Sequence, residues 1–229
     1  MTEAVRIGVV AEGPTDLIAL QAVIKAILKD QPFIITPLRP QRVETVLGGT
    51  TDASQPIYAQ KGWSGVHNWC QEVSTVPQGE NLIMHQVVVI HLDVDVAGFT
   101  YASANITQLP TYSDLPCEKP CPPASDSADA LIDVAKSWLL PVVPQPNWLW
   151  CCPGYNMETW AYTAYKPQKA CIKSKLECSR DIAGRVTKTE KAYKEKYANM
   201  LESRWTEVQR LCSLAQQFTD DLCTCLAAI

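Results

Sequence analysis

The chain has 229 residues, of which 47% are apolar and 19% are charged, and its formal net charge is −4. This length and composition predict one globular domain with room for a helical appendage, and they exclude a protein that is basic overall. Since no apolar run reaches the roughly eighteen residues of a membrane span, and MTEAVRIG is not a basic leader followed by an apolar segment, we expect a cytoplasmic protein without membrane contact.

The predicted elements alternate between strands and helices. The predicted strands span residues 5–11, 33–47, 87–96 and 148–152. The predicted helices span residues 15–29, 127–139 and 187–226, with another ending near Val73 and one beginning near Asn156. Residues 101–127, rich in Pro, Ser and Thr, predict a long loop. The expected fold is therefore α/β: a parallel or mixed sheet flanked by helices over residues 1–165, with a helical C-terminal region over residues 166–229 packed on it.

The first strand ends in an acid. In RIGVVAEGPTD, β-branched residues run into Glu12, and Gly13 and Pro14 then break the strand. Thr15 or Asp16 is expected to cap the following helix, because both side chains can accept hydrogen bonds from its first N–H groups. The alternative role of Asp16 is an additional acid beside a functional site. The alternative for Glu12 is an acid that merely favours the helix N-terminus.

The stretch HQVVVIHLDVDVAG carries two more acids. Val87 to Ile90 predict a buried strand, and the alternation of Leu92, Val94 and Val96 extends it. Asp93 and Asp95 then point to one face of the strand, and His91 to the same face. For His91 we favour a packed strand residue over a site residue. Two like charges side by side are costly unless a cation neutralises them.

The three acids are expected to meet at one edge of the sheet. Functional groups collect at the carboxyl ends of parallel strands, which is where Glu12, Asp93 and Asp95 fall. Oxygen ligands of this kind suit Mg²⁺ or Mn²⁺ rather than zinc. Because Mg²⁺ completes its shell with waters and substrate phosphates, the pattern indicates phosphodiester or phosphoryl chemistry.

These motifs resemble the Toprim domain of topoisomerases, DnaG-type primases, OLD-family nucleases and RecR-type proteins. The resemblance covers roughly residues 5 to 100, from EGPTD to DVDVAG. It implies a Toprim-like, Rossmann-like fold in which Asp93 and Asp95 bind Mg²⁺. It also implies that Glu12 is a metal ligand or proton-transfer group and that Gly13 is the glycine that follows it.

A narrower resemblance begins at CPGYNMETWAYTAY. This stretch and the Lys/Tyr-rich helix after it are similar to the DUF4276 group of Toprim-like proteins, which implies a role in defence against phage and plasmids. Glu158 matches an acid of that group and Trp160 the following aromatic residue. A first-turn helix acid is the alternative reading of Glu158. The loop at 101–127 and the many cysteines depart from the pattern and leave substrate choice open.

Lysines and arginines crowd residues 166–196, although the chain is acidic overall. Lys188, Lys191 and Lys194 are the predicted contacts to a phosphate backbone. A solvated helix face is the alternative, since glutamates stand at helical spacing among them.

The ten cysteines are expected to be free thiols, as in a reducing cytosol. A zinc site of Cys117 and Cys121 with Cys151 and Cys152 is the alternative, although structural zinc sites favour closer pairs than the C-x3-C spacing found here.

The leading hypothesis is a Mg²⁺- or Mn²⁺-dependent nuclease that cleaves phosphodiester bonds in nucleic acid. One rival is a non-catalytic Toprim-like module that works with a partner protein such as an ATPase. Another is a phosphatase or phosphotransferase acting on a small phosphorylated substrate. A homodimer fits the small size of the chain. The sequence leaves open DNA against RNA and endonuclease against exonuclease action.

Overall fold

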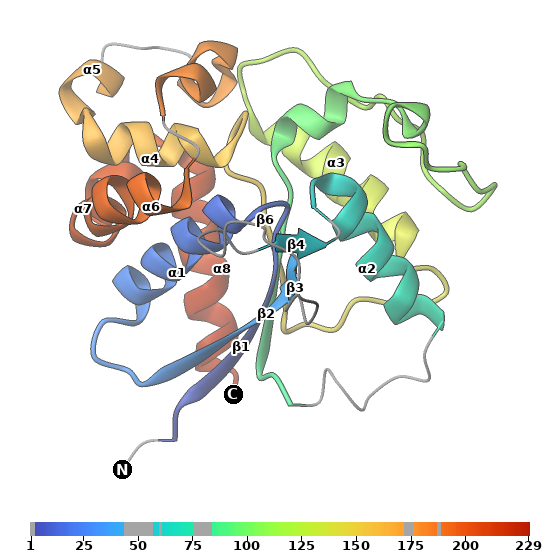
Figure 1. Cartoon of the computed structure of the whole chain (residues 1–229), viewed down its shortest axis with the longest axis horizontal. Coiled ribbons are helices and arrows are strands. Elements are labelled where there is room, and N and C mark those ends of the chain that lie inside the picture. Colours follow the sequence, from blue (N-terminus) through green and yellow to red (C-terminus); the bar gives the residue numbers. More distant parts are fainter. Residues whose placement is uncertain (1–2, 44–56, 60, 76–83, 172–175, 187–188) are drawn as a thin grey trace, which may run out of the picture.

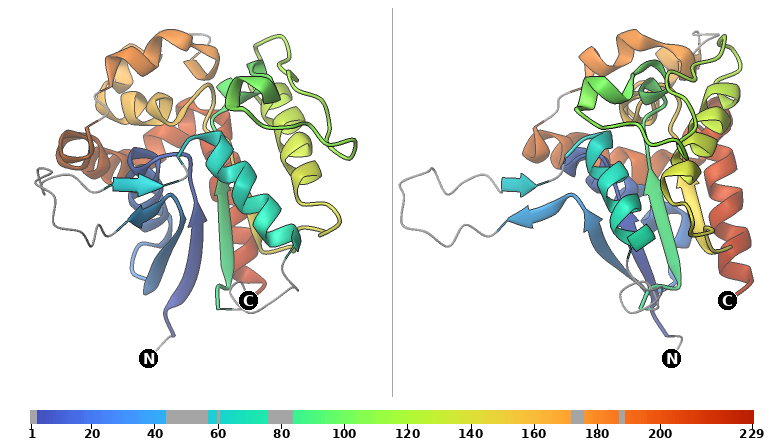
Figure 2. Two further views of the ribbon diagram at one scale, coloured as in Figure 1. Left: turned by 45° about the vertical axis from the view of Figure 1, so that its right-hand side comes forward. Right: turned by 90° about the vertical axis from the view of Figure 1, so that its right-hand side faces the viewer.

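The structure is a computed structural model that describes residues 3–43, 57–59, 61–75, 84–171, 176–186 and 189–229 (Figure 1). A four-stranded parallel sheet with helices on both faces forms its centre, which is an α/β architecture of the Rossmann-like class. The strands of this sheet, in spatial order, are β2 (Phe33–Arg39), β1 (Val5–Val10), β5 (Val87–His91) and β6 (Trp148–Cys151). Two short strands, β3 (Gln41–Val43) and β4 (Ile57–Ala59), pair antiparallel in a separate ribbon that projects from the body (Figure 2).

Helical segments make up most of the remaining described chain. The α-helices are α1 (Pro14–Leu28), α2 (Trp63–Thr75), α3 (Ser125–Trp138), α4 (Met157–Tyr165), α5 (Pro167–Cys171), α6 (Glu190–Tyr193), α7 (Asn199–Leu211) and α8 (Ser213–Ala227). Four 3₁₀ segments and one π-helical turn join them: η1 (Val94–Gly98), η2 (Tyr101–Ala104), η3 (Leu176–Cys178), η4 (Arg180–Arg185) and the π-helix η5 (Lys194–Ala198).

The strand order explains which helices cover which face. The connection from β1 to β2 runs one way across the sheet, whereas those from β2 to β5 and from β5 to β6 run the other way. Because parallel crossovers are right-handed, α1 must lie on one face and α2 and α3 on the opposite face. The α1 face also carries α4 and α7, as Figure 1 shows. The direction of winding therefore reverses between β1 and β5, the two central strands.

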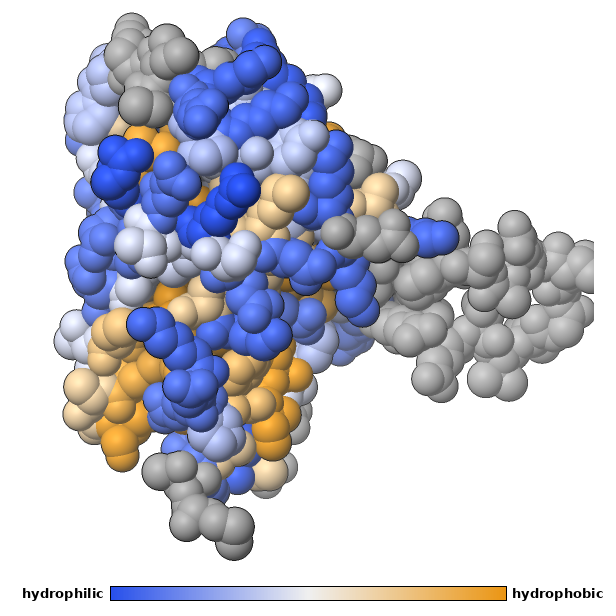
Figure 3. Space-filling model, turned by 90° about the vertical axis from the view of Figure 1, so that its left-hand side faces the viewer, coloured by the Kyte–Doolittle hydropathy of each residue, from blue (hydrophilic) through white to orange (hydrophobic). Residues whose placement is uncertain are grey.

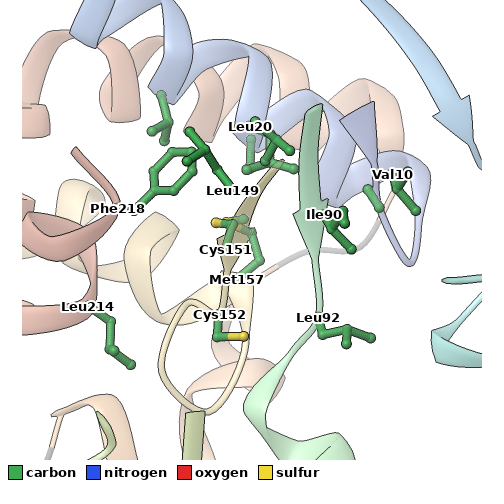
Figure 4. Close-up of a cluster of buried hydrophobic side chains, with 14 of the residues drawn as sticks. Val10, Leu20, Ile90, Leu92, Leu149, Cys151, Cys152, Met157, Leu214 and Phe218 are labelled. Atoms are coloured by element: carbon green, nitrogen blue, oxygen red, sulfur yellow. The ribbon is translucent and has the colours of Figure 1, made fainter. Parts of the chain in front are cut away.

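The core is built from the sheet and the helices on both faces. All five residues of β5 are buried, as expected for a central parallel strand covered on both sides. Figure 4 shows Leu20 of α1, Leu149 of β6 and Phe218 of α8 meeting on one face of the sheet. Polar side chains dominate the upper part of the surface in Figure 3, the end to which the strands point in Figure 1, and apolar groups gather below.

Two predicted elements are divided in the structure. The strand region 33–47 separates into β2 and β3 around Pro40, and residues 44–47 lie outside the described residues. The helix predicted over 187–226 is interrupted by the π-helical turn and by Cys212, whose extended backbone (φ −126°, ψ 111°) separates α7 from α8. This break lets α7 pack against α1 and α4 while α8 packs against β6.

Candidate active site

The acids predicted from the sequence lie where the winding reverses. Glu12 follows β1 and Asp93 follows β5, and these strands are neighbours. The Oε1 atom of Glu12 accepts a hydrogen bond of 2.7 Å from the backbone N–H of Asp93. In open α/β sheets such a reversal opens a crevice at the carboxyl ends of the strands. The geometry therefore brings together two residues that are 81 positions apart in the chain.

Two groups from different elements contact the carboxylate of Asp93. Its Oδ1 atom accepts a hydrogen bond of 2.9 Å from the N–H of Met157, the first residue of α4, and lies 3.3 Å from Nε2 of His91. The N-terminus of a helix favours an anion, so α4 stabilises the ionised form of Asp93. His91 is fully buried at the end of β5, as a packed strand histidine would be, yet it also contacts the acidic site.

The prediction that Asp93 and Asp95 share one strand face is wrong. β5 ends at His91, and residues 94–98 form the 3₁₀ segment η1. The reason is that β6 ends at Cys151 and the chain beyond it turns at Gly154. The N–H groups of Val94 and Asp95 therefore bond to the carbonyls of Gly154 and Tyr155, not to a neighbouring strand. Asp95 nevertheless acts electrostatically on Glu12, so it belongs to the same acidic cluster.

Asp16 is not the N-cap residue of α1, although its carboxylate accepts a hydrogen bond from the backbone N–H of Gly13. The N-cap is Gly13, with extended backbone and no side-chain cap, and Asp16 is instead buried in the first turn. A β-carbon on Gly13 would lie 3.1 Å from the Oδ2 atom of Asp16, so a side chain at position 13 would crowd this carboxylate. Glu158, in the first turn of α4, is also buried, and it raises the pKa of Asp16. Both additional acids named from the sequence thus lie in the cluster.

The cluster is electrostatically strained. Burial raises the pKa of Asp16 to about 7, and repulsion by Asp93 and Glu158 adds to this effect. Burial, followed by the charge of Asp93, raises the pKa of Glu12 well above its usual value. Burial lowers the pKa of His91, so its imidazole is held neutral. Protons or a cation must therefore offset the repulsion between these carboxylates.

Tyr193 is a site residue that the sequence analysis missed. It is 1% exposed, and its phenol feels the charges of Asp16, Glu158 and Asp93. Within the described residues, the Tyr193 hydroxyl and both ring nitrogens of His91 have no hydrogen-bond partner. In KAYKEKY this tyrosine stands between lysines, so the local sequence does not indicate that it is buried. Its partners lie far away in the chain, and Asp16 precedes it by 177 positions. The one local signal is that Tyr193 and Tyr197 fall on the same face of that helix, between charged residues.

The predicted phosphate contacts lie on the outside of the same segment. Lys191 and Lys194, on either side of Tyr193, are exposed. Lys188 lies outside the described residues. Nearby, the ammonium of Lys196 lies 4.5 Å from the ring centre of Tyr165, and that of Lys166 lies 5.0 Å from it. The helix that places a phenol beside the acids therefore also presents lysines to solvent.

A disulfide corrects the prediction that all cysteines are free. Cys121, in the loop before α3, is bonded to Cys178 of η3, which removes Cys121 from the zinc alternative. Cys117 is a half-buried thiol, and Cys151 and Cys152 are buried thiols. No group of three or more His, Cys, Asp or Glu side chains in the described residues forms a ready-made metal site, with zinc or with any other ion.

Glu177, next to Cys178 of the disulfide, connects the turn after β6 to the start of α8. Its carboxylate accepts hydrogen bonds from the N–H groups of Ser213 and Leu214 and so caps α8. Its backbone carbonyl accepts a hydrogen bond of 2.7 Å from the N–H of Tyr155. Gly154 has φ +61°, and a β-carbon there would lie 3.1 Å from the Cα of Glu177. Position 154 therefore requires glycine for two independent reasons.

Comparisons with models of protein families, with curated proteins and with solved structures return no match. None of the helices in the described ranges is both long and apolar enough to cross a membrane.

Proposed function

We propose that this protein is a Toprim-like nuclease that uses Mg²⁺ or Mn²⁺ to cleave phosphodiester bonds in nucleic acid. The observation that carries the proposal is the convergence of Glu12, Asp93 and Asp95 with Asp16 and Glu158 at the point where the sheet reverses its winding. The order of the acids along the chain, with Glu12 after one strand and an Asp-x-Asp after a later one, agrees with the Toprim pattern.

The donor set fits a hard divalent cation. The cluster offers carboxylate oxygens, and the charges that raise the pKa of Glu12 come from aspartates. A cation would offset this repulsion. The protein need not enclose the ion completely, because Mg²⁺ is commonly held by one or two carboxylates and completes its shell with waters and substrate phosphates. Asp93, Asp95 and Glu12 are the residues that would hold it.

The residues of the cluster and the nearby lysines would have different roles in the reaction. A divalent cation at this site would stabilise negative charge on the phosphate and lower the pKa of water. The N–H of Met157 orients the Asp93 carboxylate, and the N–H of Asp93 orients Glu12. The raised pKa of Glu12 favours the protonated form of its carboxyl group, which suits it to proton transfer. Lys191 and Lys194, exposed beside Tyr193, would contact the phosphate backbone.

The test is cleavage of supercoiled plasmid and of labelled single strands with Mn²⁺, Mg²⁺ or EDTA. We expect metal-dependent cleavage that falls at least about 100-fold in Glu12→Gln and in the double variant Asp93→Asn, Asp95→Asn. The matched control is Glu3→Gln, an exposed glutamate just before the same strand, which should cleave as the parent does. Equal cleavage by Glu12→Gln and the parent would refute the assigned site.

Absence of cleavage by the parent would be read together with thermal unfolding. If Mn²⁺ stabilises the parent and Glu12→Gln abolishes this stabilisation, the metal site stands and the substrate is instead a small phosphate ester. Hydrolysis of generic phosphate esters would then be measured. Neither cleavage nor metal-dependent stabilisation would reject metal-dependent chemistry and favour a non-catalytic interaction module.

A further inference from the structure

A groove runs along the free edge of the main sheet. β6 is the last strand in the order β2-β1-β5-β6, and no strand of the described chain pairs with its outer edge. A cavity of about 280 Å³ follows this edge between α3 and α8, and we call it the β6 groove. Its volume is close to the lower end of the range, roughly 300–1,000 Å³, found for ligand pockets.

The β6 groove has apolar walls on both sides of the strand. Trp148 and Trp150 point toward the α3 side, as the packing of Trp148 on Trp69 of α2 shows, and Leu149 points toward α8. Figure 4 shows Leu149 beside Phe218 of α8. Ile132 of α3 and Leu214 of α8 complete the apolar lining. A chain lying along β6 would therefore find apolar surface for successive side chains on both faces.

The backbone of β6 offers hydrogen bonds along the groove. The carbonyls of Asn147 and Cys151 accept bonds from Val88 and Leu92 of the β5 side. Because the backbone groups of a strand alternate between its two edges, those of Trp150 face the groove. An edge strand of this kind is a template for a further strand. β6 spans four residues, so an added segment would pair over about four or five residues, or roughly 15 Å.

Two carboxylates stand among the apolar residues that line the groove. Asp129 of α3 and Asp221 of α8 line it. The other charged residues of these helices are Asp126, Asp133 and Lys136 on α3 and Asp220 on α8. Lys136 also lines the groove, but its ammonium lies 3.2 Å from the carboxylate of Asp133, which offsets its charge. The lining of the groove is therefore net negative through Asp129 and Asp221.

We propose that the β6 groove binds an extended segment of a partner protein in which apolar side chains are flanked by lysines or arginines. The apolar side chains would occupy the walls, the backbone would pair with Trp150, and the cations would meet Asp129 and Asp221. A second copy of this chain fits the groove less well. Its own β6 lies recessed between the same two helices, and pairing would bring like carboxylates together. This inference does not rest on the nuclease proposal.

The experiment starts from random 12-residue peptides displayed on phage, selected against the immobilised full chain. We expect enriched peptides to alternate apolar residues with lysine or arginine. The best peptide, synthesised with a fluorophore, should bind at least about 10-fold more weakly to the double variant Asp129→Asn, Asp221→Asn, and more weakly as salt rises. The matched control, Asp126→Asn with Asp220→Asn, removes one aspartate from each of the same helices outside the groove lining and should bind as the parent does.

A second measurement locates the peptide. On saturation, hydrogen exchange of the Trp150 amide should slow, as expected for a new β-ladder. The proposal is overturned if no peptide is enriched, if acidic peptides are enriched, if both double variants bind equally, or if the Trp150 amide is unaffected by a bound peptide. Dimerisation of the parent that is lost in Asp129→Asn, Asp221→Asn would assign the groove to a second copy and likewise overturn it.

Discussion

Asp16 should make the metal-free protein less stable as the pH rises. It is 8% exposed, and its pKa rises from 3.8 to about 7 on folding, first through burial and then through the charge of Asp93. Below about pH 4 the side chain is protonated in both states and has no effect. Between about pH 4 and 7 the unfolded chain releases the proton while the folded chain keeps it. The free energy of unfolding therefore falls with rising pH in this window.

The magnitude follows from the shift. Each pKa unit corresponds to about 1.4 kcal/mol, so a shift of about three units makes the ionised state cost about 4 kcal/mol above pH 7. Asp16→Asn removes this cost. We expect the variant to be more stable than the parent at pH 7.5 by a few kcal/mol. At pH 4 we expect no gain. The raised pKa of Glu12 acts in the same direction, so a smaller slope will remain.

The assay is urea unfolding in EDTA at pH 4.0, 6.0 and 7.5. Asp126→Asn is the matched control. Asp126 also lies in the first turn of a helix but is exposed, so its substitution removes a similar helix-dipole interaction without changing a buried charge. Its pH dependence should equal that of the parent. If Asp16→Asn also keeps the full pH slope of the parent, the carboxylate is not held in a repulsive site and the electrostatic argument fails.

Three further predictions concern stability and the site. Replacing both Cys121 and Cys178 by serine should lower the free energy of unfolding by up to about 4 kcal/mol, because the disulfide closes a loop with a sequence separation of 57. Equal urea midpoints for the oxidised parent and the variant would contradict this. Gly154→Ala should cost about 2 kcal/mol or more in the same assay, and Gly184→Ala, where a β-carbon meets open space, should cost much less. Tyr193→Phe should fold with unchanged stability, because the Tyr193 hydroxyl has no hydrogen-bond partner in the described structure. The variant should change the increase in melting temperature that Mn²⁺ causes, because Tyr193 lies beside the acids. An unchanged increase would show that Tyr193 is not part of the site.

The local elements were predictable because their signals are local. The β-branched run before Glu12, the apolar spacing after Pro14 and the uninterrupted apolar run of β5 each specify an element without reference to distant residues. The positions of Glu12 and Asp93 at strand ends follow from the same signals. Their contact was expected only because parallel strands share a carboxyl edge, and it required β1 and β5 to be neighbours.

Where the predictions were wrong, tertiary contacts outweighed the local pattern. The alternation of Leu92, Val94 and Val96 is typical of a strand, but the chain leaves the sheet once its neighbour β6 ends. Asp16 has the residue type and position of a cap, yet Gly13 leaves room for its carboxylate to turn into the site. A strand extends, and a polar residue caps, only where the surrounding structure supplies the matching partners.

The sequence by itself determined the α/β class, the strand ends that carry Glu12 and Asp93, and the basic character of the C-terminal region. Only the tertiary structure decided that Asp16 and Glu158 are buried with them, that Tyr193 joins the cluster, that Cys121 is bonded to Cys178, and that α3 and α8 enclose the edge of β6. The physical reason is that hydrogen bonding and apolar periodicity act between near neighbours in the chain. Burial, charge repulsion and disulfide pairing depend instead on which distant segments pack together.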